Sequence, residues 1–348
     1  LQLNSVCQRG RKKTLRVNSD PIADLGDSHA PVPFFVSSRG YGVLVDTARY
    51  ATFYFGTHVR RGTTTNDTGS RGVATDTAEL YAARSYDEGL HTLIEIPAVK
   101  GIEIYVFAGP DIAGVVKRYN MFCGGGAMPP MWGLGMWYRT WGQSSRADVE
   151  RQMGQIRADR MPVDVFGFEP GWQTHAYSCT YVWNNQKFPD HDELIAKLNE
   201  AGFRPNLWTH LYVHPDSPLY GALEPTAGDY KVWGGIVPDL SLEENRRIFR
   251  DYYKSYFLDR GISGFKIDEC DGSDFINTPW SYPEQSQFPS CLDGEQMHTL
   301  MGMLSQKMLE PAYREKNVRT YNNVRSSGAM ASPMPYVLYS DLYDIDDF

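Results

Sequence analysis

Beyond residue 130 the sequence alternates between short apolar runs and amphipathic segments, and this alternation limits the possible folds more than any other feature. It is typical of a parallel α/β sheet, in which each strand is followed by a helix that packs on the sheet. The apolar runs predict six strands, at residues 133–138, 163–168, 204–209, 264–268, 320–324 and 336–339.

Capping signals predict where four of the intervening helices begin. In each, a Ser or Asp that can accept a backbone hydrogen bond is followed three residues later by an acidic residue or Gln. Gly202 and Gly261 are expected to end the second and third of these helices, because glycine tolerates the left-handed backbone found there. The four pairs are Ser145 with Asp148, Asp190 with Glu193, Ser241 with Glu244, and Asp293 with Gln296.

Two architectures share this order of elements, a (β/α)8 barrel and an open doubly wound sheet. A doubly wound sheet that binds a dinucleotide has a glycine-rich phosphate loop after its first strand, and none follows residue 138. We therefore predict an α/β fold of the (β/α)8 TIM-barrel type, truncated so that about six units are present. The six-stranded doubly wound sheet is the alternative.

The residue pattern of the first third of the chain is typical of β structure. Short β-branched or aromatic runs, separated by Gly, Ser and Asp, occur at 33–36, 42–45, 50–55, 93–97 and 102–107. A short helix is expected over 110–119. The glycines at 124–126 and the two prolines that follow mark the clearest domain boundary. We predict an incomplete N-terminal β-sandwich domain at 1–127 and the catalytic barrel at 128–348.

Composition excludes several classes of protein. The chain has 348 residues with 34 Lys and Arg against 42 Asp and Glu, and its net charge of -8 argues against a nucleic-acid-binding surface. No stretch of 18 apolar residues occurs, so no membrane span is predicted. The five cysteines are scattered, without the spacing of a zinc site or a disulfide framework. The oligomeric state stays open, and a periplasmic or secreted location is slightly favoured over the cytoplasm.

Polar residues stand at the carboxyl ends of all six predicted strands. Functional residues of a barrel gather at this end, and a charge that is buried there needs a partner or a function. The residues are Arg139, Glu169, His210, Asp268, Arg325 and Asp341. This set predicts a polar site at the mouth of the barrel.

The fourth strand carries the most informative of these ends. Lys266 and Asp268 lie two residues apart, and they share one face because side chains alternate along a strand. An ammonium group next to a carboxylate lowers the pKa of the carboxylate and keeps it ionised, as a nucleophile requires. The alternative is a buried ion pair that only fixes the barrel.

Asp341 follows the sixth strand and is flanked by Tyr339 and Tyr343. Partial desolvation between tyrosines would raise the pKa of Asp341 and suit a general acid, although an Asp in this place is also common as a helix N-cap. Asp268 and Asp341 can face each other across the barrel mouth. One carboxylate that attacks and a second that protonates the leaving group make up the retaining glycosidase arrangement.

Aromatic residues near the strand ends suit a sugar-binding cleft, since a flat ring can pack on the C–H face of a sugar. Trp208 and His210 share a face of the third strand, where they could stack on a sugar and bond a hydroxyl. A core Trp and a structural His are equally compatible with that position. Trp172, in the loop after the second strand, is expected to form a wall of the cleft.

Several motifs resemble glycoside hydrolase family 31, and the resemblance covers nearly the whole chain. Residues 129–135 (PPMWGLG) are similar to the start of that family's first barrel strand, and residues 188–190 (FPD) to the segment after its second strand. Residues 265–268 (FKID) resemble its nucleophile motif. Arg325, followed 16 residues later by Asp341, matches the family's spacing between a substrate-binding Arg and the acid/base Asp.

This resemblance implies that Asp268 is the nucleophile, Asp341 the general acid/base and Arg325 a substrate ligand. It implies hydrolysis of a terminal α-glycosidic bond with retention by an exo-acting enzyme that needs no metal and no organic cofactor. A carbohydrate is then the expected partner. The expected substrate contacts are Arg325, Lys266, Glu169, Trp172, Trp208 and His210.

Two departures from the family's pattern concern the sugar pocket. Many α-glucosidases of the family have an Asp two residues after the position of Glu169, and Gly171 stands there in this chain. Lys266 stands where α-glucosidases usually have Trp, as in family members that act on other sugars. The departures favour an α-galactoside or an N-acetyl-α-galactosaminide, with the α-glucosidase and α-xylosidase activities of the same family as the alternative.

Two further interpretations compete with an active glycosidase. A non-catalytic carbohydrate-binding protein on the same barrel would keep the aromatic cleft without needing both Asp268 and Asp341. A chain without the last two barrel units would leave a parallel edge unpaired, which predicts an unstable and inactive piece of an active enzyme.

Overall fold

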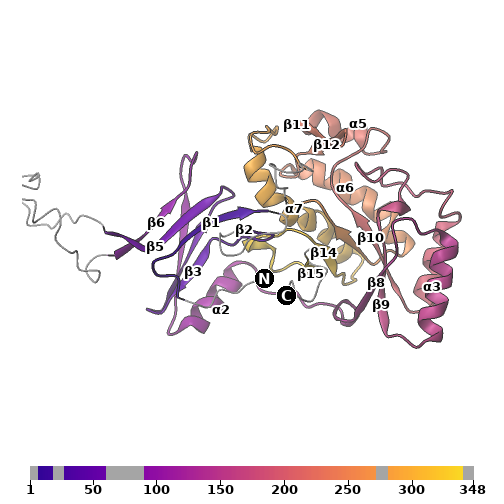
Figure 1. Ribbon diagram of the computed structural model, residues 1–348, viewed down its shortest axis with the longest axis horizontal. Helices are drawn as coiled ribbons and strands as arrows, with labels where there is room; N and C mark the ends of the chain where they lie inside the picture. The colour runs from indigo at the N-terminus through magenta and orange to yellow at the C-terminus, as the bar shows by residue number, and fades with distance from the viewer. Residues whose placement is uncertain (1–6, 19–26, 60–89, 272–280, 340–348) are drawn as a thin grey trace, which may run out of the picture.

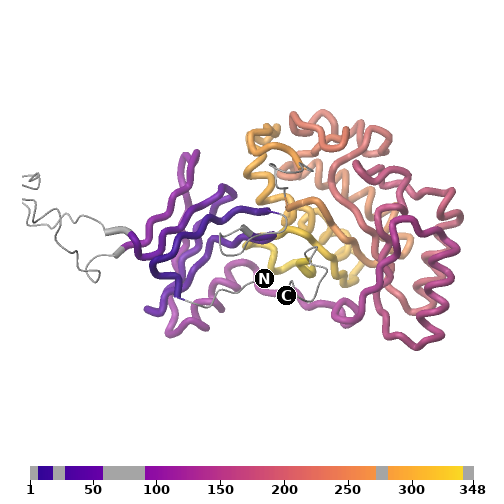
Figure 2. Tube along the Cα trace, in the orientation of Figure 1, coloured from indigo at the N-terminus to yellow at the C-terminus, as the bar shows by residue number. Residues whose placement is uncertain are grey.

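A computed structural model describes residues 7–18, 27–59, 90–271 and 281–339, and its chain path is drawn in Figures 1 and 2. The largest element is a six-stranded sheet in the order β15-β14-β13-β10-β9-β8. Its strands are β8 (Met136–Arg139), β9 (Val163–Phe168), β10 (Arg204–Thr209), β13 (Gly264–Ile267), β14 (Asn322–Val324) and β15 (Tyr336–Leu338).

The order of this sheet decides between the two architectures. Each strand pairs in parallel with the strands of the sheet that precede and follow it along the chain. A doubly wound sheet reverses its strand order at a switch point, whereas a barrel keeps the strands in sequence. The described sheet is therefore six consecutive units of a barrel, and the doubly wound alternative is wrong.

The observed strands lie close to the predicted ones. The predictions at 163–168 and 204–209 coincide with β9 and β10, and Glu169 and His210 directly follow these strands. The first predicted strand starts too early, because Met131–Leu134 form a 3-10 turn in which the Gly133 N–H donates to the Pro130 carbonyl. A short hairpin that the sequence did not predict, β11 (Ala227–Val232) with β12 (Gly235–Pro238), forms a separate sheet after β10.

Helices pack on the sheet between the strands, as Figure 1 shows. The capping boxes at Ser145 and Asp293 are confirmed, since each side chain accepts a hydrogen bond from the backbone N–H three residues later. The main helices of this region are α3 (Arg146–Ala158), α4 (His191–Glu200), α6 (Glu243–Tyr256) and α7 (Gly294–Glu315), with the short α5 (Tyr220–Leu223) between β10 and β11.

The other two capping predictions need correction. Asp190 is the residue before α4, but it has a left-handed backbone (φ 48°) and its side chain makes no capping hydrogen bond. Ser241 is not the N-cap of α6, which follows Leu242. The Ser241 hydroxyl instead donates to Asp239 Oδ1 at 2.6 Å, a local bond that competes with a cap.

The N-terminal part forms two small sheets, in the orders β2-β1-β5-β6 and β3-β4-β7. Phe35 of the second sheet meets Phe53 and Phe55 of the first at ring-centroid distances of 6.2 and 5.4 Å. The strands are β1 (Lys12–Val17), β2 (Asp27–Ser28), β3 (Phe34–Ser37), β4 (Tyr41–Asp46), β5 (Ala51–Val59), β6 (Leu90–Glu95) and β7 (Glu103–Ala108). The predicted short helix is α2 (Ile112–Phe122), which packs Val115 and Tyr119 on the second sheet.

Alternation along β13 directs one face of the sheet toward the helices and the other toward the site. Phe265 and Ile267 are 1% and 0% exposed, and the Phe265 ring packs 4.9 Å from that of Tyr253 on α6. Lys266, between them, points to the opposite face. Within the described ranges no helix is long and apolar enough to cross a membrane.

Helix α7 approaches the loop after β14 at Gly302, and this contact yields a prediction. A Cβ at Gly302 would lie 2.1 Å from the Ser326 carbonyl oxygen. We expect Gly302→Ala to lower the free energy of unfolding by about 1–3 kcal/mol, because the loop has to move. Urea unfolding followed by circular dichroism measures this change.

Gly154 on α3 is the matched control, since a Cβ there would meet nothing within 4 Å. Gly154→Ala is expected to be neutral or to stabilise the protein by up to about 1 kcal/mol, the ordinary helix preference of Ala. Equal effects of the two substitutions would contradict the close approach of α7 to Ser326.

Candidate active site

The strand-end residues gather at one end of the parallel sheet. Arg139 closes β8, Glu169 follows β9, His210 follows β10, Asp268 follows β13 and Arg325 follows β14. Because the strands are parallel and adjacent, these ends lie at the same edge. Asp341, the sixth predicted site residue, lies outside the described residues, so its distance from Asp268 stays a prediction.

Asp268 is surrounded by hydrogen-bond donors and positive charges. Its Oδ2 accepts the indole N–H of Trp208 at 2.7 Å and lies 3.6 Å from Lys266 Nζ. Its Oδ1 accepts the backbone N–H of Glu269 at 3.0 Å and lies 3.3 Å from Arg325 Nη1. Both carboxylate oxygens are therefore oriented, and the predicted pairing of Lys266 with Asp268 on one face is present.

The charge state of Asp268 follows from two opposing effects. The residue is 5% exposed, and burial by itself would raise its pKa. The positive charges of Lys266 and Arg325, together with hydrogen bonding that includes the Trp208 N–H, outweigh burial, so that the pKa of Asp268 lies below its ordinary value. Asp268 is thus held as a carboxylate, the form that can attack an electrophilic carbon.

Glu169 and Lys266 form the part of the site next to Asp268. Lys266 Nζ lies 3.7 Å from Glu169 Oε2, so it bridges Glu169 and Asp268. Arg139 Nε donates to the other oxygen of Glu169, and Arg139 Nη1 donates to Asn206 Oδ1 at 2.8 Å. The side chains of Glu169 and Lys266 are 21% and 16% exposed, so part of each remains accessible.

The two tryptophans differ from their predicted positions. Trp172 is 1% exposed and packs on Trp183 and Phe257, so it lies in the core instead of forming a cleft wall. Its indole N–H donates to the Trp208 carbonyl at 2.8 Å. Trp208 is also 1% exposed, and its side chain binds Asp268 rather than presenting a flat face to solvent.

His210 is fully buried among aromatic rings and remains neutral. Burial lowers its pKa to about 3, an effect that the nearby charge of Asp268 opposes only in part. The backbone N–H of Tyr212 donates to Nδ1 at 3.1 Å, which leaves the ring proton on Nε2. The rings around it belong to Tyr177, Trp208, Tyr212 and Trp233.

Tyr339 is a site residue whose role the sequence did not reveal. It follows β15, and Lys266 Nζ lies 5.0 Å from the centre of its ring. Burial raises the pKa of Tyr339 well above its ordinary value, and the charge of Asp268 raises it further. The predicted sixth strand ran through residue 339, whereas β15 ends at Leu338, so Tyr339 stands at the strand end where functional residues of a barrel gather.

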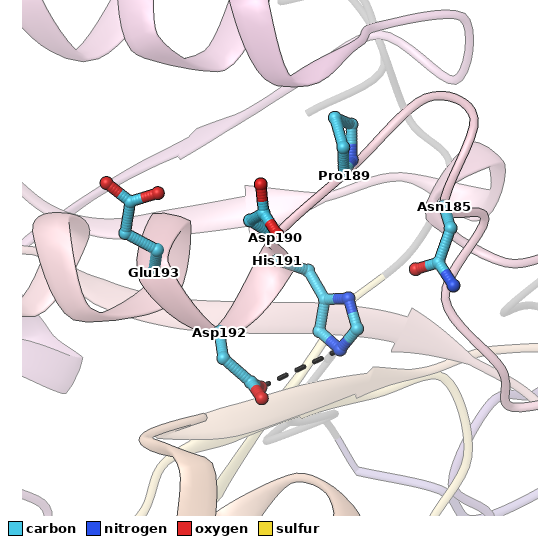
Figure 3. A pocket seen from close by; sticks show the side chains of 6 residues that line it. All are labelled: Asn185, Pro189, Asp190, His191, Asp192 and Glu193. Carbon is cyan, nitrogen blue, oxygen red and sulfur yellow. Dashed lines mark ion pairs between the residues drawn. The ribbon is translucent and has the colours of Figure 1, made fainter.

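A surface hollow elsewhere on the barrel does not coincide with this cluster. It lies at the start of α4, where His191 Nε2 is 3.7 Å from Asp192 Oδ1 (Figure 3). Burial lowers the pKa of His191, so this contact is a charged pair only at acidic pH. None of the strand-end residues lines it. Among the described side chains, no group of three or more His, Cys, Asp or Glu could hold a metal ion.

Comparison with known families agrees with this geometry. Residues 126–342 match the family model described as the glycosyl hydrolases family 31 TIM-barrel domain. The chain belongs to glycoside hydrolase family 31. The resemblance expected from the motifs at 129–135 and 265–268 is confirmed, and the matched range contains the whole six-stranded sheet.

Curated relatives of this family 31 chain include enzymes with different substrates in their names. The α-xylosidase XylQ from Lactiplantibacillus pentosus is 26% identical over 265 residues, covering 72% of this chain and 31% of XylQ. The lysosomal α-glucosidase from Mus musculus is 25% identical over 203 residues, covering 50% of this chain and 20% of that protein. The chain spans about a third of the length of the α-xylosidases it matches.

Solved structures of family 31 share the fold across nearly the whole chain. An α-xylosidase from a soil metagenome, complexed with xylose, matches with a TM-score of 0.70 at 14% identity, over 95% of this chain and 44% of that one. A cycloalternan-forming enzyme from Listeria monocytogenes matches with a TM-score of 0.71 at 17% identity, over 96% of this chain and 32% of that one.

The indole N–H of Trp208 yields a test of how Asp268 is held. Trp208→Phe keeps an aromatic ring in the core but removes the donor to Asp268 Oδ2. For the glycoside hydrolysis that membership of the family implies, kcat/KM is expected to fall about 10-fold or more, the scale of one hydrogen bond to a charged group. Trp183→Phe is the control, since Trp183 is also buried and packs on Trp172 and Phe188. A larger loss in the control would contradict a specific role for the Trp208 N–H.

Proposed function

We propose that this chain carries the nucleophile of a retaining, exo-acting α-glycosidase that hydrolyses a terminal α-linked sugar. One observation supports this most strongly: Asp268, at the end of the fourth strand of a family 31 barrel, is held ionised by Lys266 and Arg325. A protein that only binds a carbohydrate would use such a carboxylate to accept hydrogen bonds from sugar hydroxyls, whereas a retaining glycosidase needs it to attack the anomeric carbon.

In the proposed reaction, a carboxylate oxygen of Asp268 attacks the anomeric carbon and forms a glycosyl ester, while the bond to the leaving oxygen breaks. Asp341 donates its proton to that oxygen. Asp341 then takes a proton from water, the water oxygen attacks the anomeric carbon, and the ester bond to Asp268 breaks. Two inversions give net retention. Arg325 and Lys266 stabilise the carboxylate that departs in the second step.

The domain division at residues 127 and 128 belongs to the same proposal. The contacts of Phe35 with Phe53 and Phe55 support a sandwich of the two N-terminal sheets, because they join inner faces of both. The sandwich would then be residues 1–127, and the barrel 128–348. The sheet order from β8 to β15 supports a (β/α)8 barrel, of which six units are described.

The choice of sugar draws on Gly171 and on the relatives. Gly171 replaces the hydroxyl-binding Asp, and a Cβ there would lie 1.7 Å from the Gly142 carbonyl oxygen, so the loop after β8 fills that space. The change supports a pocket that differs from that of a plain α-glucosidase. XylQ and the murine lysosomal enzyme are named for α-xylosides and α-glucosides, which favours these sugars over the expected α-galactoside. We propose an α-xyloside or α-glucoside as the substrate class.

The test is hydrolysis of p-nitrophenyl α-glycosides of xylose, glucose, galactose and N-acetylgalactosamine by the full-length protein. We expect one of the first two to have the highest kcat/KM. The galactoside hypothesis drawn from Gly171 gains support if a galactose-type substrate is cleaved faster. Proton NMR of the first product formed should show the α anomer, as retention requires. A folded protein that cleaves none of the four, while binding one of the free sugars, would favour the carbohydrate-binding alternative.

A further inference from the structure

His29 precedes the barrel in the sequence, but its side chain contacts the loop after β13, at the end of the sheet where Asp268 lies. It follows β2 of the N-terminal part, and its side chain is 6% exposed. His29 Nδ1 lies 2.9 Å from Oδ2 of Asp271, a residue 242 positions further along the chain. A carboxylate oxygen only accepts hydrogen bonds, so the imidazole is the donor in this contact.

Asp271 connects His29 to the proposed nucleophile. Its Oδ2 also accepts the Nε–H of Arg325 at 2.9 Å, and Arg325 Nη1 lies 3.3 Å from Asp268 Oδ1. The side chains of Asp271 and Arg325 are 0% and 2% exposed. Buried groups joined by charge-assisted hydrogen bonds have few alternative positions, so moving one of them displaces the next.

The backbone of His29 is fixed to the same region. The Ser327 N–H donates to the His29 carbonyl at 3.3 Å, two residues beyond Arg325. Main chain and side chain of His29 therefore bind the loops after β14 and β13 respectively. Such a double attachment orients a donor more tightly than a single contact.

We infer that His29 is a positioning residue for the reaction: through Asp271 it fixes the guanidinium of Arg325, which in turn orients the Asp268 carboxylate. This inference rests on the proposed function of Asp268. It assigns to the N-terminal part a role in the chemistry of the barrel. The imidazole contacts neither substrate nor reacting atoms, so its effect is on the geometry of the attacking carboxylate.

Three substitutions of His29 in the full-length protein separate a hydrogen bond from mere packing. His29→Asn keeps a donor near the position of Nδ1, His29→Gln moves the donor toward the position of Nε2, and His29→Leu removes it. We expect the Leu and Gln variants to lose about 10- to 100-fold in kcat, the scale of a small misplacement of a reacting group, with KM changed less than about 3-fold. The Asn variant should stay within about 3-fold of wild type.

Arg49→Gln is the matched control for docking of the N-terminal part. Arg49 binds Asp293 at the start of α7, a second contact between the two parts that does not touch Asp271. It should leave kcat near the wild-type value. An equal loss in Arg49→Gln and His29→Leu, or an Asn variant as slow as the Gln variant, would overturn the inference.

Coupling to Asp271 gives a further readout. If His29 acts through Asp271, His29→Leu should cost much less in an Asp271→Asn background than in wild type. Independent, additive losses would contradict an action of His29 through Asp271.

Labelling of wild type by an activated 2-deoxy-2-fluoro glycoside, located on Asp268 by mass spectrometry, checks the proposed function separately. If wild type is active and labelled on Asp268 while the His29 variants keep the wild-type kcat, the positioning role of His29 is refuted and the proposed function stands.

Discussion

Replacement of Asp268 by asparagine is expected to lower kcat/KM for glycoside hydrolysis by at least about 10³-fold, because an amide cannot form the glycosyl ester. The side chain keeps its size, and the Glu269 N–H can still donate to the Oδ1 position. Lys266 and Arg325 keep Glu169 and Asp271 as ion-pair partners. The loss should therefore fall on the chemistry and leave the fold in place.

The measurement is the initial rate on the best glycoside of the panel, with circular dichroism to confirm folding. Asp251→Asn is the control, because Asp251 lies on α6 with a side chain 55% exposed and pairs with Arg247 of the same helix. It should keep the wild-type rate. In Asp268→Ala, azide can occupy the vacated space and should give a β-glycosyl azide. An Asp268→Asn variant with more than about a tenth of the wild-type rate would eliminate Asp268 as the nucleophile.

Local sequence patterns predicted the parts of the fold that local physics determines. The strands at 163–168 and 204–209 were predicted with the correct bounds, from short segments rich in apolar residues that are buried along most of their length. The capping boxes at Ser145 and Asp293 depend only on residues three positions apart. The prediction of Ser241 as an N-cap was wrong because its hydroxyl donates to Asp239, two residues upstream, instead of capping the helix.

The pairing of distant side chains could not be predicted in the same way. Alternation placed Lys266 beside Asp268, since two residues of one strand share a face whatever surrounds them. Nothing local indicated that the Trp208 N–H would reach Asp268, which depends on the register of β10 with β13. His29 carried no signal at all, because its contact with Asp271 joins two parts of the chain through tertiary packing.

The second large effect concerns Arg325, whose guanidinium lies between two buried carboxylates. We expect Arg325→Met to lower the free energy of unfolding by about 3–5 kcal/mol near neutral pH, the usual cost of breaking a buried ion pair by removing one partner. Met is unbranched and of similar volume, so the loss reflects charge more than volume. Asp268 and Asp271 would remain close to each other, with side chains 7% and 0% exposed, without the cation that joins them.

The pH dependence of this loss has a definite sign. In wild type the pKa of Asp268 lies below its ordinary value, so its ionised form stabilises the fold above that value, and this contribution is lost as the pH falls toward the native pKa. Without Arg325, burial of Asp268 is opposed by the charge of Lys266 but no longer by the guanidinium, so the pKa of Asp268 rises and its ionised form stabilises the fold less. The difference in stability between wild type and Arg325→Met should therefore be largest at pH 7 and shrink toward pH 4.

Urea unfolding at pH 7 and at pH 4.5 tests this expectation, with Arg247→Met as the matched control. Arg247 forms ion pairs with Glu244 and Asp251 on α6, but its side chain is 50% exposed. Because solvent screens that network, the control should change the free energy of unfolding by less than about 1 kcal/mol at either pH. A loss in Arg325→Met that is equally large at both pH values would mean that packing, and not the charge between Asp268 and Asp271, makes Arg325 necessary. A loss no greater than that of the control would mean that the two carboxylates are solvated, and the electrostatic argument for an ionised Asp268 would fail with it.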